Sequence, residues 1–146
     1  MTDIDMKNIP FTSTDIRIRY AETDAMGIVH HANYYIYFER AREDLIYLSG
    51  ISYFELEQEG VMTPIIETQC RYISPAKYGD IITVKSFMEK LTPIKFEIKY
   101  EVYRKNDNTL LATGKTLMAF LNKETFTPVN LKKFRPEIWE KFSVLK

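Results

Sequence analysis

The chain has 146 residues, and its 20 basic and 20 acidic side chains leave no net formal charge at neutral pH. This length suits one domain with a full hydrophobic core, and the balanced charge excludes the broad basic surface of a typical nucleic-acid-binding protein. The single cysteine, Cys70, excludes an intramolecular disulfide and a zinc site made from cysteines of one chain, so we expect a cytoplasmic protein.

The residues up to Thr14 are polar and lack the apolar stretch of a signal peptide. No later segment has the roughly 18 uninterrupted apolar residues of a membrane-spanning helix, so we expect a soluble, unprocessed chain. Residues 15–20 then alternate apolar and polar side chains, which predicts a half-buried strand leading to Asp24.

From Asn33 the apolar side chains recur every three or four residues, which is the period of an amphipathic helix. We expect about four helical turns, with Asn33 as the N-cap and Gly50 as the C-terminal stop. The expected apolar face consists of Tyr34, Phe38, Ala41, Leu45 and Leu48.

Strand patterns dominate from residue 61 to residue 121. Short connections rich in turn-forming residues separate the strands, so neighbouring strands are expected to be antiparallel. Short helical segments are expected at residues 52–59 and after Pro136. The expected strands are residues 61–74, 80–91, 94–103 and 110–121.

This order of elements predicts an α+β fold, in which one long helix covers the apolar face of a five-stranded antiparallel sheet. Neither a linker nor a repeat divides the chain, so we expect one domain over residues 1–146. Its core should span about residues 13–122, followed by a C-terminal tail at residues 128–146.

Asp24 is the candidate catalytic group because it lies between the first strand and the helix. Unpaired amides and the helix dipole favour a carboxylate near a helix N-terminus. An ionised Asp can attack a carbonyl carbon or activate water, and free amides can stabilise the resulting oxyanion. Gly27 lets the backbone turn and approach a substrate closely. The segment therefore points to acyl transfer or hydrolysis.

Two segments of the sequence, at their mutual spacings, resemble the 4-hydroxybenzoyl-CoA thioesterase family of hotdog-fold proteins, and specifically its YbgC-like acyl-CoA thioesterase branch. The likeness covers about residues 13–122 and implies an antiparallel five-stranded sheet wrapped around one long central helix. The residues that carry it are Arg17-Ile18, Thr23-Asp24, Gly27-Ile28-Val29, Ala32, Tyr34 and Phe38, followed by residues 71–76 and Tyr78-Gly79-Asp80.

The resemblance implies a role for each matching residue. Asp24 occupies the position of the catalytic carboxylate, and the backbone amide of His31 falls where the family polarises the thioester carbonyl. Tyr20 and the His31 side chain accompany the acid, as in the YbgC-like branch. Whether Asp24 is the nucleophile or a general base stays open. The expected substrate-binding residues are Gly27, Val29 and Tyr34.

Each candidate also has an ordinary structural interpretation. Asp24 could cap a turn, His31 could only orient the loop, and Tyr20 could be an inward strand residue. Tyr34 occupies a position that is more often part of a core. His30 is expected to be a packing or surface residue.

Two further groups of polar residues could have a functional role. Glu22, Asp24, His30 and His31 have the ligand types of a metal site, but adjacent histidines rarely converge on one ion, so we expect neither a metal nor a cofactor. Glu39 lies on the helix that carries the catalytic carboxylate in some other hotdog thioesterases. With Arg42 three residues later and Arg40 adjacent, a surface or interface ion pair is the better interpretation.

The leading prediction is an acyl-CoA thioesterase that releases free CoA and a carboxylic acid, with acyl carrier protein as a second candidate carrier. A hotdog hydratase or dehydratase is an alternative, but its D-x-N-P-x-H pattern is absent after Asp24. A non-catalytic acyl-binding module is a third reading, against which Tyr20, Asp24 and His31 argue.

The resemblance also implies binding of the acyl group across a subunit interface. Open edge strands favour pairing with a second copy, so we expect a homodimer, with a homotetramer as the alternative. Neither nucleic acid nor a membrane is an expected partner.

Overall fold

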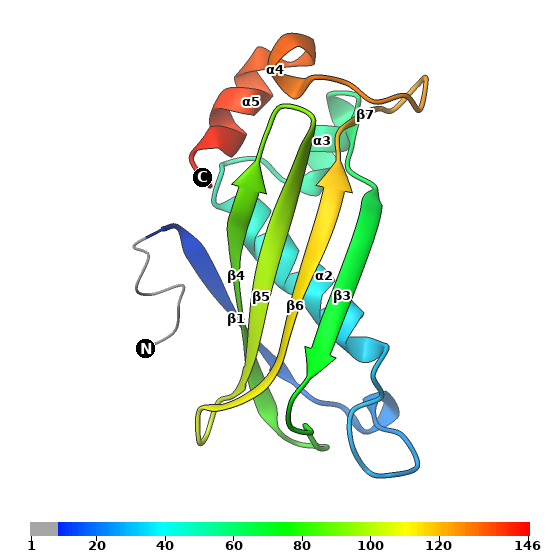
Figure 1. Ribbon diagram of the computed structural model, residues 1–146, viewed down its shortest axis with the longest axis vertical. Coiled ribbons are helices and arrows are strands. Elements are labelled where there is room, and N and C mark those ends of the chain that lie inside the picture. Colours follow the sequence, from blue (N-terminus) through cyan, green and yellow to red (C-terminus); the bar gives the residue numbers. More distant parts are fainter. Residues whose placement is uncertain (1–8) are drawn as a thin grey trace.

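The computed structural model describes residues 9–146, so the expectation of a polar, unprocessed N-terminus concerns residues that lie largely outside this range. Five strands form one sheet in the order β1-β4-β5-β6-β3 (Figure 1). All four pairings are antiparallel, which confirms the predicted five-stranded antiparallel sheet. The strands are β1 (Phe11–Arg17), β3 (Ile65–Tyr72), β4 (Ile81–Leu91), β5 (Lys95–Arg104) and β6 (Thr109–Ala119).

The helix α2 (Asn33–Tyr47) packs against one face of this sheet (Figure 1). The Phe38 ring stacks on the Tyr100 ring with a centroid distance of 4.3 Å and an interplanar angle of 5°. The same Phe38 ring lies directly over Gly114 of β6, where an added Cβ would collide with it. The sheet and α2 therefore approach closely because this strand position has no side chain.

Both ends of α2 show how local sequence determines its limits. The N-cap is Ala32 rather than the predicted Asn33, whose side-chain amide instead donates to the Glu22 carbonyl at 2.8 Å. Asn33 therefore joins the helix start to the preceding loop. Gly50, with φ of +88°, follows the helix as predicted, in a backbone conformation that L side chains rarely adopt.

Three predicted strands have different limits in the structure. The first ends at Arg17, because the chain then turns into the short 3-10 helix η1 (Tyr20–Glu22), in which the Glu22 carboxylate accepts the Arg19 amide. The strand predicted at residues 61–74 is split into β2 (Val61–Met62) and β3, with Pro64 between them. Proline has no amide to donate, so it interrupts a ladder. The strand predicted at residues 110–121 is divided into β6 and β7 (Leu121–Asn122).

Strand β3 is an edge strand with apolar side chains open to solvent. By contrast, Phe96, Ile98 and Tyr100 of β5, the central strand of the same sheet, are fully buried, which confirms the predicted apolar face of that strand. The exposed apolar residues of β3 are Ile65, Ile66 and Tyr72.

The predicted helical segments at residues 52–59 and after Pro136 are present. Ser52 caps α3 (Tyr53–Gln58) in a capping box with Glu55. The C-terminal helices α4 (Leu131–Phe134) and α5 (Pro136–Ser143) lie at the end of the sheet away from the start of α2 (Figure 1). Among residues 9–146, no helix is long and apolar enough to cross a membrane.

Candidate active site

The loop between η1 and α2 presents Asp24. Its backbone amide donates to the Ile28 carbonyl at 2.8 Å, and its carbonyl accepts the Gly27 amide at 3.0 Å. Gly27 has φ of +79°, which allows the tight turn. One carboxylate oxygen, Oδ1, accepts the Met26 amide at 2.8 Å. Asp24 therefore does cap a turn, but its second oxygen makes no hydrogen bond within residues 9–146.

Within residues 9–146, the turn that enters α2 leaves one backbone amide without an acceptor. The amides of Val29 and His30 donate to the carbonyls of Ala76 and Glu22, and the Ala32 amide donates to Nδ1 of His30 at 3.2 Å. Asn33 and the residue after it also have carbonyl acceptors. The His31 amide alone, among residues 29–34, has no acceptor in the described part of the chain. It is therefore available to a ligand.

Asp24 and His31 line the same pocket of about 300 Å³. Val29 and Tyr34 also line it, so the structure brings together four of the six predicted site residues. The other two, Tyr20 and Gly27, do not line it. The sequence did not single out a functional role for Tyr72, which lines this pocket from the end of β3. The only available signal was its place in the second family-like segment, residues 71–76.

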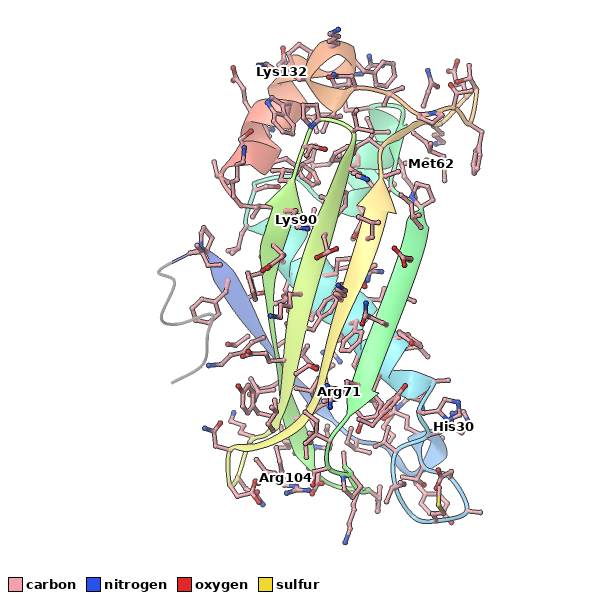
Figure 2. All side chains as sticks on the ribbon, viewed as in Figure 1. His30, Met62, Arg71, Lys90, Arg104 and Lys132 are labelled. Carbon is pink, nitrogen blue, oxygen red and sulfur yellow. The ribbon has the colours of Figure 1, made fainter. Side chains whose placement is uncertain are left out.

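Tyr20 is not an inward strand residue. Its side chain is 76% exposed, and its ring meets the Tyr78 ring edge-on at 5.7 Å. His30 is exposed and stacks on the His31 ring at 4.3 Å. Figure 2 shows His30 and Arg71 near the same end of the sheet, while Met62 lies toward the other end.

Two tyrosines support the pocket from different elements. The Tyr72 hydroxyl donates to the His31 carbonyl at 3.0 Å, and the Tyr34 and Tyr72 rings meet edge-on at 5.2 Å. Burial raises the pKa of Tyr34 to about 12, and desolvation also raises the pKa of Tyr72 above its usual value. Both phenols are therefore protonated at neutral pH and remain hydrogen-bond donors.

Glu22 has a structural role beside this loop. Its Oε1 accepts hydrogen bonds from the Arg19 amide and from the Tyr37 hydroxyl. Within residues 9–146 no three His, Cys, Asp or Glu side chains gather as a metal-binding group.

Among residues 9–146, Glu39 and Arg42 do not form an ion pair with each other. Arg42 is buried, with 4% of its surface exposed, and its guanidinium donates to the hydroxyls of Tyr53 and Tyr100, each at 3.1 Å. No carboxylate oxygen among residues 9–146 lies within 4.0 Å of its charged nitrogens. Helical spacing placed Arg42 with the polar residues, but packing against β5 and α3 takes it into the interior.

The fold and this pocket define a thioesterase-like α+β protein. A model of the thioesterase-like superfamily matches residues 18–142, and the chain belongs to that superfamily. This confirms the resemblance found in the sequence.

The similar proteins carry thioesterase names. The putative acyl-CoA thioesterase YneP of Bacillus subtilis is 34% identical over 124 residues, which cover 84% of this chain and 88% of that protein. The acyl-CoA thioesterase YbgC of Helicobacter pylori is 25% identical over 129 residues, covering 84% and 95% of the two chains. The crystal structure of a DHNA-CoA thioesterase from Staphylococcus aureus superimposes with a TM-score of 0.86 at 34% identity, covering 91% of this chain and 89% of that one.

Proposed function

We propose that the protein is an acyl-CoA thioesterase that hydrolyses an acyl-CoA to free CoA and a carboxylic acid. The observation that carries the proposal is the juxtaposition of a carboxylate and an unpaired amide, from Asp24 and His31, on one pocket. Thioester hydrolysis needs both a group that attacks or activates water and a donor for the developing oxyanion. The thioesterase names of the relatives support the same activity.

In this mechanism the thioester carbonyl oxygen accepts a hydrogen bond from the His31 amide. As a general base, Asp24 takes a proton from water while the water oxygen bonds to the carbonyl carbon. The tetrahedral intermediate then expels the CoA sulfur, which receives the proton. As a nucleophile, Asp24 would itself bond to the carbon and release CoA, and water would then hydrolyse the anhydride. One preorganised oxyanion donor contributes about 3 to 4 kcal/mol to transition-state stabilisation.

The surrounding residues hold these two groups in place. Gly27 permits the turn that presents Asp24, and Val29 fixes the loop through its bond to the Ala76 carbonyl. Tyr34 forms part of the pocket wall. The side chains of His31 and Tyr20 are proposed to contact the CoA side of the substrate, because both are exposed near the loop.

We further propose that the working form is a homodimer, with a tetramer as the alternative, in which each sheet wraps around its α2 helix in the hotdog arrangement. Edge strand β3 leaves backbone groups available for pairing, and its exposed Ile65 and Ile66 provide apolar surface. The exposed Tyr35 and Ile36 of α2 provide further apolar surface. A two-fold dimer would cover β3 in both copies.

Release of thiol from a panel of acyl-CoAs tests the activity. Asp24→Asn keeps an oxygen to accept the Met26 amide, so the loop should persist while kcat/KM falls by roughly 100-fold or more. Glu140→Gln, which removes an exposed carboxylate on α5, is the matched control and should retain activity. Thiol release that survives Asp24→Asn would contradict the mechanism.

The same panel separates the alternative functions. A hydratase or dehydratase would change the acyl group without releasing thiol, and a binding module would bind acyl-CoA without altering it. Assays of the same acyl groups attached to acyl carrier protein show whether the CoA thioester or the carrier-protein thioester is the better substrate.

A further inference from the structure

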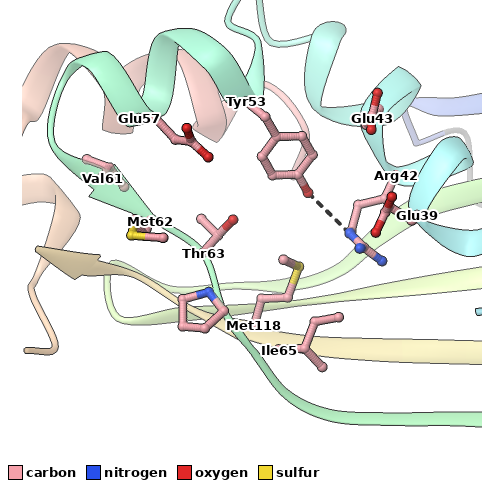
Figure 3. Close-up of a pocket in the computed structure, with 11 residues that line it drawn as sticks. Glu39, Arg42, Glu43, Tyr53, Glu57, Val61, Met62, Thr63, Ile65 and Met118 are labelled. Atoms are coloured by element: carbon pink, nitrogen blue, oxygen red, sulfur yellow. Dashed lines mark hydrogen bonds between the residues drawn. The ribbon is translucent and has the colours of Figure 1, made fainter. Parts of the chain in front are cut away.

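Arg42 projects into a second pocket, of about 440 Å³, between α2, α3 and the start of β3. Figure 3 shows the guanidinium extending from α2 into this pocket, near Met118 and Ile65. Its Nε and Nη1 donate to Tyr53 and Tyr100, whereas Nη2 makes no hydrogen bond within residues 9–146. No fully enclosed polar side-chain atom of the described residues lacks a partner, so the unbonded Nη2 keeps some accessible surface, and Arg42 lines this pocket. The pocket therefore presents unused donors of a buried cation.

The lining of this pocket indicates what kind of ligand would use those donors. Apolar side chains, among them Val61, Met62, Ile65 and Met118, suit a hydrocarbon body. An oxygen that reached Arg42 would gain a hydrogen bond to a charged donor, which is stronger than one between neutral groups.

The charge around the pocket disfavours a fully anionic ligand. Three exposed carboxylates, from Glu39, Glu43 and Glu57, line the same pocket and face one guanidinium. A ligand carboxylate would therefore meet repulsion from the rim, whereas an uncharged oxygen would not. The lining fits an apolar group that ends in a hydroxyl or keto oxygen.

The position of the pocket relates it to the proposed dimer. Within one chain, Tyr72 lines the Asp24 pocket and Ile65 lines the Arg42 pocket, at opposite ends of β3. Seven strand steps separate them by about 23 Å. An antiparallel pairing of two β3 strands centred on Gln69 places Ile66 opposite Tyr72 of the second copy, so that Ile65 lies beside this Tyr72, with strand axes about 4.8 Å apart. The Arg42 pocket of one copy would then continue the Asp24 pocket of the other.

We propose that Arg42 is a specificity-determining residue that acts in trans, donating from Nη2 to an uncharged oxygen at the far end of the acyl group held at Asp24 of the second copy. This inference rests on the proposed thioesterase function and dimer. It adds a substrate class, which is an acyl group with an apolar body and a terminal hydroxyl or keto oxygen.

The first experiment compares kcat/KM for matched acyl-CoAs. One arm uses hydroxybenzoyl-CoA against benzoyl-CoA, a second uses an ω-hydroxyacyl-CoA against the acyl-CoA of equal length, and a third uses the corresponding dicarboxylyl-CoA. The wild-type protein should favour the hydroxylated member of the aryl or the alkyl pair by roughly 10-fold or more. The dicarboxylyl-CoA should not be preferred over the unsubstituted acyl-CoA of equal length.

Arg42→Gln should reduce this preference to roughly 2-fold or less. Arg42→Lys, which keeps the charge but lacks Nη2, should do the same and serves as the second variant if the first does not fold. Arg40→Gln removes the exposed arginine two residues earlier and should keep the wild-type preference. An unchanged preference in either folded Arg42 variant overturns the proposal.

The second experiment mixes two defective chains. A mixed dimer contains one Asp24→Asn chain and one Arg42→Gln chain, and each of its sites combines Asp24 of one chain with Arg42 of the other. One site therefore carries both substitutions. The other site has the intact Asp24 of the Arg42→Gln chain and the intact Arg42 of the Asp24→Asn chain. Mixing Arg42→Gln with excess Asp24→Asn should therefore restore the hydroxyl preference. A preference that stays at the Arg42→Gln value overturns action in trans. Absence of thiol release from every acyl-CoA would instead overturn the thioesterase function, whereas release without a hydroxyl preference overturns this inference alone.

Discussion

The Tyr72 hydroxyl donates to the His31 carbonyl at 3.0 Å, which ties the last residue of edge strand β3 to the turn that enters α2. Among residues 29–34, the amide of this same His31 is the one without an acceptor in the part of the chain that the structure describes. The strand proposed to pair with a second copy therefore also holds the proposed oxyanion donor. The proposed interface and the proposed active site therefore share this contact.

Replacing Tyr72 with Phe should lower kcat by roughly 3- to 30-fold and leave KM nearly unchanged, because the lost bond orients a donor used mainly in the transition state. Steady-state kinetics measure both constants. Tyr47→Phe, which removes a 69% exposed phenol from α2, is the control and should match the wild type. If kcat falls, KM rises and the thermal stability also falls, Tyr72 has a merely structural role.

Replacing Ile66 with Lys should weaken the dimer, because the substitution places a charge on the apolar edge of β3. Sedimentation analysis over a range of concentrations should show a shift toward monomer, together with lower specific activity at low protein concentration. Ile94→Lys is the matched control, since Ile66 and Ile94 are both 54% exposed. If both variants sediment as the wild type does, β3 is not the interface.

Replacing Gly114 with Ala should reduce the free energy of unfolding by about 2 to 4 kcal/mol, because the new Cβ collides with the Phe38 ring in a close-packed core. Urea unfolding monitored by circular dichroism measures the change. The double variant Gly114→Ala with Phe38→Leu should recover part of the loss relative to the two single changes. Simple additivity of the two losses would show that the two residues do not interact.

The stability of the protein should depend on Tyr34 at high pH. Its folded pKa is raised from 10.0 to about 12 by burial, so its contribution is complete below pH 10 and is lost as the pH rises toward 12. In that window the free energy of unfolding should fall by up to about 1.4 kcal/mol per pH unit from this group. Tyr34→Phe should therefore show a shallower decline than the wild type in urea titrations between pH 9 and pH 11. Equal slopes would contradict the assignment.

Much of the fold follows from local pattern. The alternation at residues 94–103 predicted a strand with one buried face, and Phe96, Ile98 and Tyr100 are indeed buried on β5. The helical period starting at Asn33 predicted α2, although packing moved the N-cap to Ala32. These patterns are readable because the backbone geometry of a helix or strand decides which side chains share a face.

Local sequence pattern predicted most of the strands, the long helix and the loop that presents Asp24. Packing between elements sets which distant groups meet that loop and which polar residues are buried. Tyr72 and His31 are separated by 41 positions, and Arg42 and Tyr100 by 58. Neither contact has a local signature, and helical spacing suggested a Glu39–Arg42 pair that does not form among the described residues. The physical reason is that periodicity reports one element at a time, whereas burial and hydrogen-bond partners depend on how separate elements pack.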